Sequence, residues 1–386
     1  MYNHLSSHTV YSNKMKKLFF QVLFVSLCFS CKSQLSPIKM ALDSSNEKIS
    51  IVTKNMSNHD IQIKLSTIND KNQKKKFKDY NYHTNKKNYF YPASTVKLPI
   101  TIFAIEKLNE NNLINLDTRF KVENDTVTTT MRKEINEILI MSSNESYNRL
   151  FEFLGQDYIN RKLDEKGMKK SRIFHRLSTE NSSDTKTRKI IFYIKDSLAI
   201  EYPIIQNKKL KNLNLNKLFK GDGYIDIDGN LISKPMNFSR KNYLPIDELH
   251  HLTKLIFFPE KFKNGYKLNL NKEQLEFIKQ SMSSTPKDIG YDREEFYDSY
   301  SNLFIYGDTK EINSNKIKIF NKIGFAYGCL TESAFIKSEK NSFILSATIK
   351  VNNNRIYNDD EYEYDNIGFP FLAELGREIL NILESQ

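Results

Sequence analysis

The chain has 386 residues, enough for one large domain or two ordinary ones. Its hydrophobic fraction of 39% and aromatic fraction of 12% support a packed core and exclude a globally disordered protein. The formal net charge of +12 favours weak attraction to anionic surfaces. Because the lysines are spread along the chain, without a zinc-finger, homeodomain or RNA-recognition signature, nucleic-acid binding is not expected.

Residues 1–34 are predicted to be an export leader. A basic start at 15–17 precedes a mostly apolar run at 18–29, which is too short to span a membrane permanently. The pair Ser30-Cys31 resembles the cleavage site of bacterial lipoproteins, in which Cys31 becomes the lipid-carrying N-terminus. An uncleaved anchor helix is the alternative. Either interpretation predicts an exported protein, and lipidation predicts a membrane-attached periplasmic or outer-membrane-associated lipoprotein.

The cysteine pattern argues against disulfides and metal sites. Apart from two cysteines in the leader, Cys329 is the only cysteine, so no intrachain disulfide is possible in the mature body. No Cys/His set with zinc spacing accompanies it. The aspartates near residue 226 mimic a calcium loop, but Tyr224 and Pro235 occupy its first and twelfth positions. We therefore expect no metal and no cofactor.

The remaining elements are predicted in chain order from apolar periodicity. Residues 35–46 predict a polar tether, followed by two strands and a lysine-rich surface loop: Lys48–Lys54, Ile61–Thr67 and Lys71–Lys78. Four helices follow: Ser94–Leu108, Thr130–Met141, Ser146–Leu154 and Asp157–Lys166. A hairpin turns at Asp228-Gly229. Two helices, three strands and a closing helix complete the chain: Pro245–Phe257, Lys272–Met282, Lys316–Ile323, Ser333–Lys337, Ser342–Val351 and Phe369–Leu383.

The most informative motif is Ser94-Thr95-Val96-Lys97, at the start of a long apolar helix pattern. A serine and a lysine three positions apart lie on one helix face, so the amine can take the proton of the hydroxyl. Lys97 can act as a base only if burial and neighbouring cations lower its pKa. By itself the spacing is weak, because an N-cap serine before a solvated lysine gives the same pattern.

Two further motifs lie downstream. In Ser142-Ser143-Asn144 a loop serine could relay a proton and the Asn144 amide could hold a substrate amide, although a helix-capping cluster would look the same. In Lys322-Ile323-Gly324 the cation could bind a carboxylate on a strand edge, and the glycine would let a substrate backbone approach. Alone, this triplet has almost no specificity.

Together the three motifs resemble those of the serine β-lactamase and DD-peptidase superfamily, and the flanking segments are most similar to class A β-lactamases. The resemblance covers roughly residues 45–180 and 240–386. It implies these roles: Ser94 as nucleophile, Lys97 as proton acceptor, Ser142 as proton shuttle, Asn144 as substrate-orienting amide, and Lys322 as carboxylate-binding cation. It also implies an oxyanion hole made by the backbone N–H groups of Ser94 and of a residue after Gly324, identified as Ala326.

Three positions depart from the family pattern. Ser143 replaces the usual aspartate, and Ile323 replaces a threonine or serine whose hydroxyl helps to bind the carboxylate of a β-lactam. Class A enzymes also carry a glutamate that activates water for deacylation, and Glu180 is the only candidate in the corresponding segment. A solvated loop glutamate is the competing interpretation of Glu180. His175 is a possible substitute base, with a structural role as its alternative.

The resemblance implies an α/β fold, with an antiparallel five-stranded sheet flanked by helices and an all-helical lobe. After the leader at 1–34 and the tether at 35–46, we expect one catalytic domain, 47–386. Its predicted parts are a sheet lobe (47–93 and 256–386), a helical lobe (94–255) and an insertion (182–240) on the active-site rim.

The implied function is acyl transfer through a covalent Ser94 intermediate. Hydrolysis of β-lactams is the first expectation. The alternatives are a DD-peptidase or esterase acting on a cell-wall substrate, or a penicillin-binding protein with little turnover. The expected partner is a small β-lactam or a peptidoglycan-derived molecule, and we expect a monomer.

Overall fold

An antiparallel five-stranded sheet, in the order β11-β12-β13-β1-β2, is the centre of the computed structural model, which describes residues 36–71, 74–195, 198–292, 294–312 and 316–385. Its strands are β1 (Gln62–Lys71), β2 (Lys74–Tyr82), β11 (Lys318–Ala326), β12 (Cys329–Lys337) and β13 (Ser342–Lys350). Register pairs such as Leu65↔Leu345 join β1 to β13, so the two ends of the chain complete one sheet. The predicted α/β class, with an antiparallel five-stranded sheet flanked by helices, is confirmed.

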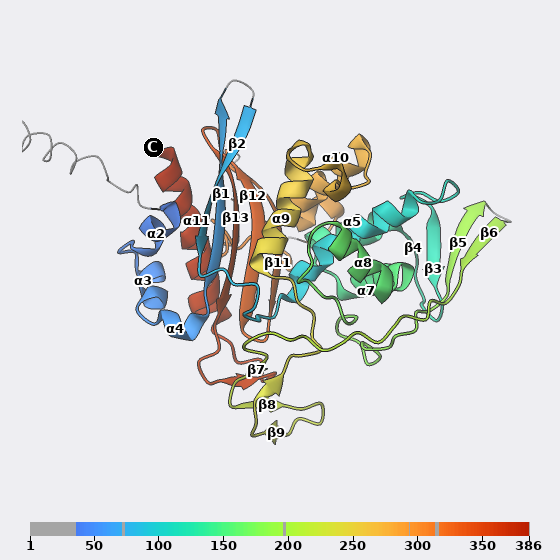
Figure 1. Ribbon diagram of the computed structural model, residues 1–386, viewed down its shortest axis with the longest axis horizontal. Coiled ribbons are helices and arrows are strands. Elements are labelled where there is room, and N and C mark those ends of the chain that lie inside the picture. The colour runs from blue at the N-terminus through green and yellow to red at the C-terminus, as the bar shows by residue number, and fades with distance from the viewer. Residues whose placement is uncertain (1–35, 72–73, 196–197, 293, 313–315, 386) are drawn as a thin grey trace, which may run out of the picture. The chain divides into compact units, whose positions relative to one another are not determined.

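Helices cover both faces of this sheet (Figure 1). On one face lie α2 (Pro37–Leu42), α3 (Glu47–Thr53), α4 (Met56–His59) and the closing helix α11 (Phe369–Glu384). The apolar side chains of these helices and of the sheet form one core cluster, which includes Ile49, Leu345 and Leu375. On the opposite face α9 (Ile246–Phe257) packs against β13, β12 and β1. Alternating side chains along each strand thus reach two separate cores.

The helical lobe is built around α5 (Lys97–Leu108), with α6 (Met131–Ile140), α7 (Asn144–Leu154), α8 (Gln156–Glu165) and α10 (Lys272–Ser283) about it. Nearly every side chain of α5 is buried, which explains its continuous apolar sequence. Contrary to the prediction, the lobe is not all-helical, because it carries a four-stranded sheet in the order β4-β3-β5-β6. Its strands are β3 (Arg119–Val122), β4 (Thr128–Thr130), β5 (Ile190–Lys195) and β6 (Leu198–Tyr202).

Short elements fill the connections. They are η1 (Ala93–Val96), η2 (Pro259–Lys261), η3 (Asn264–Tyr266), η4 (Pro286–Ile289), the π-helical turn η5 (Tyr364–Gly368), and strands β7 (Phe219–Lys220), β8 (Gly223–Ile225), β9 (Leu231–Ile232), β10 (Met236–Asn237) and β14 (Ile356–Tyr357). The hairpin predicted about Asp228-Gly229 is the antiparallel pair β8–β9. β14 adds to it in parallel, so the segment is tied to the C-terminal part of the chain.

The N-terminal predictions need correction. The tether predicted for 35–46 contains α2, whose Ile38, Ala41 and Leu42 are buried against α11. The strand predicted at Lys48–Lys54 is α3. The Asn46 side chain caps this helix by accepting from the Lys48 N–H, and Ile49 and Val52 are buried at helical spacing. The loop predicted at 71–78 largely belongs to the β1–β2 hairpin.

The lobe boundaries also shift. The predicted boundary at residues 255–256 falls inside α9, and α10, assigned to the sheet lobe, contributes Ile278 and Met282 to the helical core. The insertion predicted for 182–240 is only partly a rim decoration, because Ile190 and Phe192 of β5 are buried in that same core. In the described part of the chain, no helix is both long and apolar enough to cross a membrane. The leader and Cys31 lie outside the described residues.

Candidate active site

Ser94 lies in η1, the tight turn that leads directly into α5. The turn is held by Thr95, whose N–H and hydroxyl both donate to the Pro92 carbonyl, at 3.2 and 2.7 Å. Ala93 has a φ of +46°, an uncommon conformation for a residue with a side chain. Thr95, Val96 and Lys97 are buried, whereas Ser94 is partly exposed. The local fold therefore presents one hydroxyl to solvent at a helix start.

Gly324 brings strand β11 against this turn. A Cβ atom at Gly324 would lie 2.5 Å from the backbone N of Ser94 and 2.7 Å from that of Thr95. No side chain fits at such distances without moving backbone atoms. The sequence suggested that this glycine makes room for substrate, but its direct effect is to let β11 approach the turn that carries Ser94.

Ser142 connects the two lysines of the motifs. The Lys97 Nζ donates to the Ser142 carbonyl, and it lies 3.4 Å from the Ser142 hydroxyl and 2.7 Å from Oδ1 of Asn144. The Lys322 Nζ donates to the same Ser142 hydroxyl at 2.9 Å. Ser142 has a φ of +58°, which lets its carbonyl and hydroxyl both face the lysines. Three segments that are distant in sequence thus converge.

Both lysines are almost fully buried, with 0% of Lys97 and 1% of Lys322 exposed. Burial lowers the pKa of Lys97 well below its ordinary value, and the neighbouring Lys322 lowers it further. Burial also lowers the pKa of Lys322 to about 7, although Glu332 opposes that shift. The shift of Lys97 favours its neutral amine, the form that can accept a proton, and Lys322 exchanges protons near pH 7.

A pocket of about 400 Å³ opens beside these groups. It is lined by Ser94, Ser142, Asn144, Ile323 and Gly324, which the motifs predicted, together with a wall that they did not predict. That wall comes from residues 297–307, from Phe325, and from 364–369 in and after η5. Tyrosines are frequent in the first of these segments, but no spacing in the sequence pointed to a pocket.

Ala326, predicted to complete an oxyanion hole, is not among the residues that line the Ser94 pocket. The β11–β12 turn, Tyr327-Gly328, has positive φ at both positions, 53° and 69°, as in a two-residue type I′ hairpin. In such a hairpin the flanking residues, Ala326 and Cys329, hydrogen-bond to each other. The N–H of Phe325 therefore faces the open edge of β11. Phe325 lines the Ser94 pocket, whereas Ala326 lines a different one, so of these two residues Phe325 is the one beside Ser94.

Glu180 does not lie at the pocket. It is exposed in a turn and is not among the residues that line the Ser94 pocket. The side chain that reaches the site from this segment is Ser178, whose hydroxyl accepts from Nδ2 of Asn144 at 2.9 Å. His175, the other candidate base, lines a separate cavity with Ala326, and burial lowers its pKa to about 4. The structure therefore brings neither candidate to Ser94.

Sequence reasoning also missed Glu332, a fully buried carboxyl group on β12. It accepts from the N–H of Phe304 at 2.6 Å and from the side chain of Asn321. Burial raises its pKa to about 8. The Phe304 bond fixes the segment that carries Leu303 of the pocket wall. No motif marks this residue, because its role depends on the packing of a loop against the sheet.

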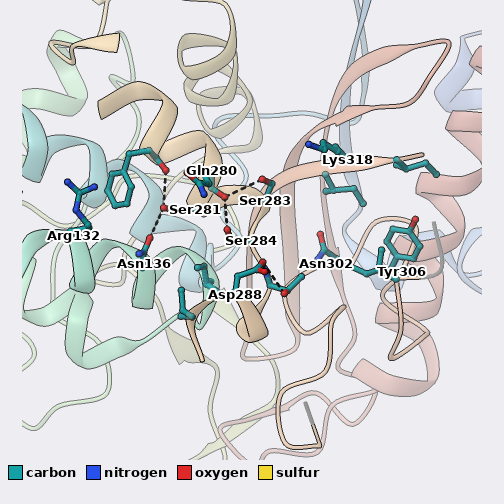
Figure 2. Close-up of a pocket in the computed structure, with 17 residues that line it drawn as sticks. Arg132, Asn136, Gln280, Ser281, Ser283, Ser284, Asp288, Asn302, Tyr306 and Lys318 are labelled. Carbon is teal, nitrogen blue, oxygen red and sulfur yellow. Dashed lines mark hydrogen bonds between the residues drawn. The ribbon is translucent and has the colours of Figure 1, made fainter. Parts of the chain in front are cut away.

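A second cavity, of about 870 Å³, lies outside the three motifs (Figure 2). It lies among α6, α10 and the first residues of β11, and Ser281 within it donates to Asn136 at 2.7 Å. It shares Asn302 with the Ser94 pocket but contains no residue of the three motifs. In the described part of the chain, no group of three or more His, Cys, Asp or Glu side chains is placed to hold a metal ion.

Comparisons with known proteins show which fold this chain has. Residues 38–198 match the model of a family described as the β-lactamase enzyme family. No curated protein sequence matches the chain. A class A β-lactamase from Bacteroides cellulosilyticus is similar over 92% of this chain and 100% of its own, with 12% identity and a TM-score of 0.52.

Two other solved structures are similar to the same extent. A class A β-lactamase from Mycobacterium abscessus covers 89% of this chain and 100% of its own, with 13% identity and a TM-score of 0.52. The protein PBP-A is similar over 91% of this chain and 96% of its own, with 12% identity and a TM-score of 0.51. The resemblance seen in the motifs is thus confirmed. The chain has the fold of the class A β-lactamases and their penicillin-binding relatives, and its residues 38–198 carry the sequence pattern of the β-lactamase enzyme family.

Proposed function

We propose that this protein is a serine hydrolase that forms a covalent acyl-enzyme at Ser94 and releases the acyl group slowly. The observation that carries the proposal is the junction at Ser142, where Lys97 and Lys322, both buried, meet one hydroxyl beside the Ser94 pocket. An ordinary helix cap would need neither buried lysine. Because burying an amine is costly, two such amines at one pocket support a chemical role.

Acylation uses these groups in sequence. The neutral Lys97 amine takes the Ser94 proton, and the freed oxygen attacks the carbonyl carbon of an amide, lactam or ester. The N–H groups of Ser94 and Phe325 stabilise the negative charge that develops on the carbonyl oxygen. The carbonyl–leaving-group bond then breaks. Ser142 gives its proton to the leaving atom and receives one from the Lys322 ammonium, so the proton balance closes.

Deacylation is expected to be slow, because the usual water-activating carboxylate is missing from the pocket. Glu180 is exposed and does not line the pocket, and Asn144 contacts the Ser178 hydroxyl, which is a poor base. The acyl-enzyme should therefore accumulate. This favours a penicillin-binding protein or slow peptidase over rapid β-lactam hydrolysis. A point mutant of PBP-A, whose fold this chain shares, has been solved as an acyl-enzyme complex with penicillin G.

Intact-mass measurement after incubation with benzylpenicillin tests the proposal. We expect an added mass equal to one benzylpenicillin on the wild-type protein, persisting after the free antibiotic is removed, and no adduct on Ser94→Ala. An adduct on Ser94→Ala would contradict the assignment of the nucleophile. Rapid, continuous consumption of a chromogenic cephalosporin would instead support β-lactamase activity. Absence of both adduct and turnover would contradict acyl transfer to β-lactams.

A further inference from the structure

The unpredicted wall of the Ser94 pocket is aromatic. Tyr297 and Tyr300 line one part of it, and Phe325, Tyr364 and Phe369 line another. The second group is continuous, since the Phe325 ring lies 5.3 Å from that of Tyr364 and 5.6 Å from that of Phe369. Phe325 is 46% exposed although it belongs to the central sheet. An exposed aromatic ring beside a nucleophile is more typical of a binding surface than of a core.

The charge of the pocket does not suit an anion. No Lys, Arg or His is among its lining residues in the described part of the chain, and its one ionisable carboxyl group is that of Asp365, which is exposed. The two lysines of the site contact Ser142, are buried, and are not among the residues that line the pocket. Burial lowers the pKa of both lysines, that of Lys322 to about 7, and so disfavours their charged forms. A substrate carboxylate in this pocket would therefore be repelled by the Asp365 carboxylate and would find no cation among the lining residues.

The same pocket receives the leaving group of the proposed reaction. Ser142 lines it, and the hydroxyl that protonates the leaving atom must lie within hydrogen-bond distance of that atom. Ile323 and Leu303, both buried, line the pocket as well and offer no hydrogen-bonding side chain. The residues that surround the leaving group are thus aromatic, aliphatic or neutral, apart from Asp365.

We propose that the leaving group of the natural substrate is an uncharged aromatic or apolar moiety, without the carboxylate that a β-lactam presents. This inference rests on the proposed acyl-enzyme at Ser94. It assigns the pocket formed by residues 297–307, Phe325 and 364–369 as the leaving-group subsite of an aryl or hydrophobic ester or amide.

A matched pair of substrates tests the subsite. Phenyl and 3-carboxyphenyl esters of one acyl group give the same acyl-enzyme and differ only by a carboxylate on the leaving group. The rate of Ser94 acylation is measured by intact mass. We expect this rate to be at least about tenfold higher with the phenyl ester than with the 3-carboxyphenyl ester. An equal or faster reaction with the carboxyphenyl ester would overturn the inference while leaving acyl transfer intact. If neither ester labels Ser94, the acyl-transfer proposal fails and the inference fails with it.

Variants of the lining residues test whether the preference for the phenyl ester depends on this pocket. Asp365→Asn should speed acylation by the carboxyphenyl ester about threefold relative to the phenyl ester, because one repulsive charge is removed. Glu361→Gln, an exposed acid nearby that does not line the pocket, should leave the ratio unchanged. Phe325→Ala should slow the phenyl ester and affect the carboxyphenyl ester less. An identical ratio in wild type, Asp365→Asn and Phe325→Ala would overturn the inference.

Discussion

Among single residues, Gly324 shows most directly how backbone contact creates the site. The strand with Lys322 and the turn with Ser94 touch at this glycine, with no room for one methyl group. Sequence alone showed the glycine and suggested that it makes room for a substrate, but it did not show that β11 approaches the Ser94 turn here. The three motifs were predictable because each is a local string. The contact between them was not, because it depends on how two distant segments pack.

Gly324→Ala should damage both stability and activity. Overpacking against backbone atoms of Ser94 and Thr95 should cost about 1–3 kcal/mol of unfolding free energy. Acylation of Ser94 should fall at least about a hundredfold, since small displacements of reacting groups are costly. Gly265→Ala is the matched control, because no atom lies within 4 Å of its added Cβ. Chemical denaturation and adduct formation measure both effects, and a fully active Gly324→Ala would contradict the close contact.

Lys322 should control the alkaline side of the acylation profile. Its pKa is lowered to about 7 by burial, and the ammonium is the form that supplies a proton to Ser142. Acylation should therefore be fastest below about pH 7 and decline as pH rises through that value. The mechanism also requires a neutral Lys97 amine. Because lowering the pH protonates that amine, the acylation rate should fall again at low pH.

Replacing Lys322 isolates this effect. Lys322→Met keeps much of the side-chain volume, and it should lower the acylation rate about a hundredfold and abolish the decline above pH 7. Lys318→Met, an exposed lysine on the same strand, should keep the wild-type profile. Adduct formation measured from about pH 5 to about pH 9 checks both variants. A Lys322→Met protein that retains the alkaline decline would assign that titration to another group.

At the scale of elements, most errors came from short segments. In Lys48–Lys54 the residues Ile49 and Ile51 alternate with polar neighbours, which is typical of a strand. The structure buries Ile49 and Val52 and leaves Ile51 exposed, because the segment is a helix packed on α11. Seven residues are too few for periodicity to separate the two. The long α5 and α11 were predictable because their apolar faces repeat over several turns.

The helix α2, predicted to be part of a tether, should be part of the folded core. Ile38→Ala should lower the free energy of unfolding by about 2–5 kcal/mol, because Ile38 is 1% exposed and packs in the α11 cluster. Met40→Ala, at a position 39% exposed on the same helix, should change it by about 0.5 kcal/mol or less. Urea denaturation of the chain from Ser36 onward makes the comparison. If both substitutions change the free energy of unfolding by the same small amount, the prediction that residues 35–46 are a tether would be restored.

At the scale of the whole molecule, the sheet completed by both ends of the chain was predictable, whereas the pocket wall was not. β13 and β1 have clear apolar alternation, and the order of the motifs pointed to the fold. The wall at 297–307 has no motif, because its position depends on contacts such as that of Glu332 with the Phe304 N–H. The three motifs were therefore predictable, and the other residues that line the Ser94 pocket were not.

Export is a prediction for the whole chain. Cys31→Ser should abolish incorporation of a labelled fatty acid in a bacterial host and shift the protein from the membrane fraction to the soluble fraction. Cys28→Ser, the other leader cysteine, should behave as the wild type. Lipid labelling and membrane fractionation read out both variants. Continued labelling of Cys31→Ser would contradict lipidation at this position.

The segment 182–240 is fastened to the rest of the protein at both ends. Ile190 and Phe192 fill the helical core at one end, and at the other Asp222 pairs with Arg355 while β8 runs beside β14. Replacing this segment by a shorter loop would therefore expose apolar side chains of the helical core. It would also remove β8, the strand that pairs with β14. Substrate range in this scaffold should be easier to alter by point changes along the pocket rim than by transplanting the whole stretch.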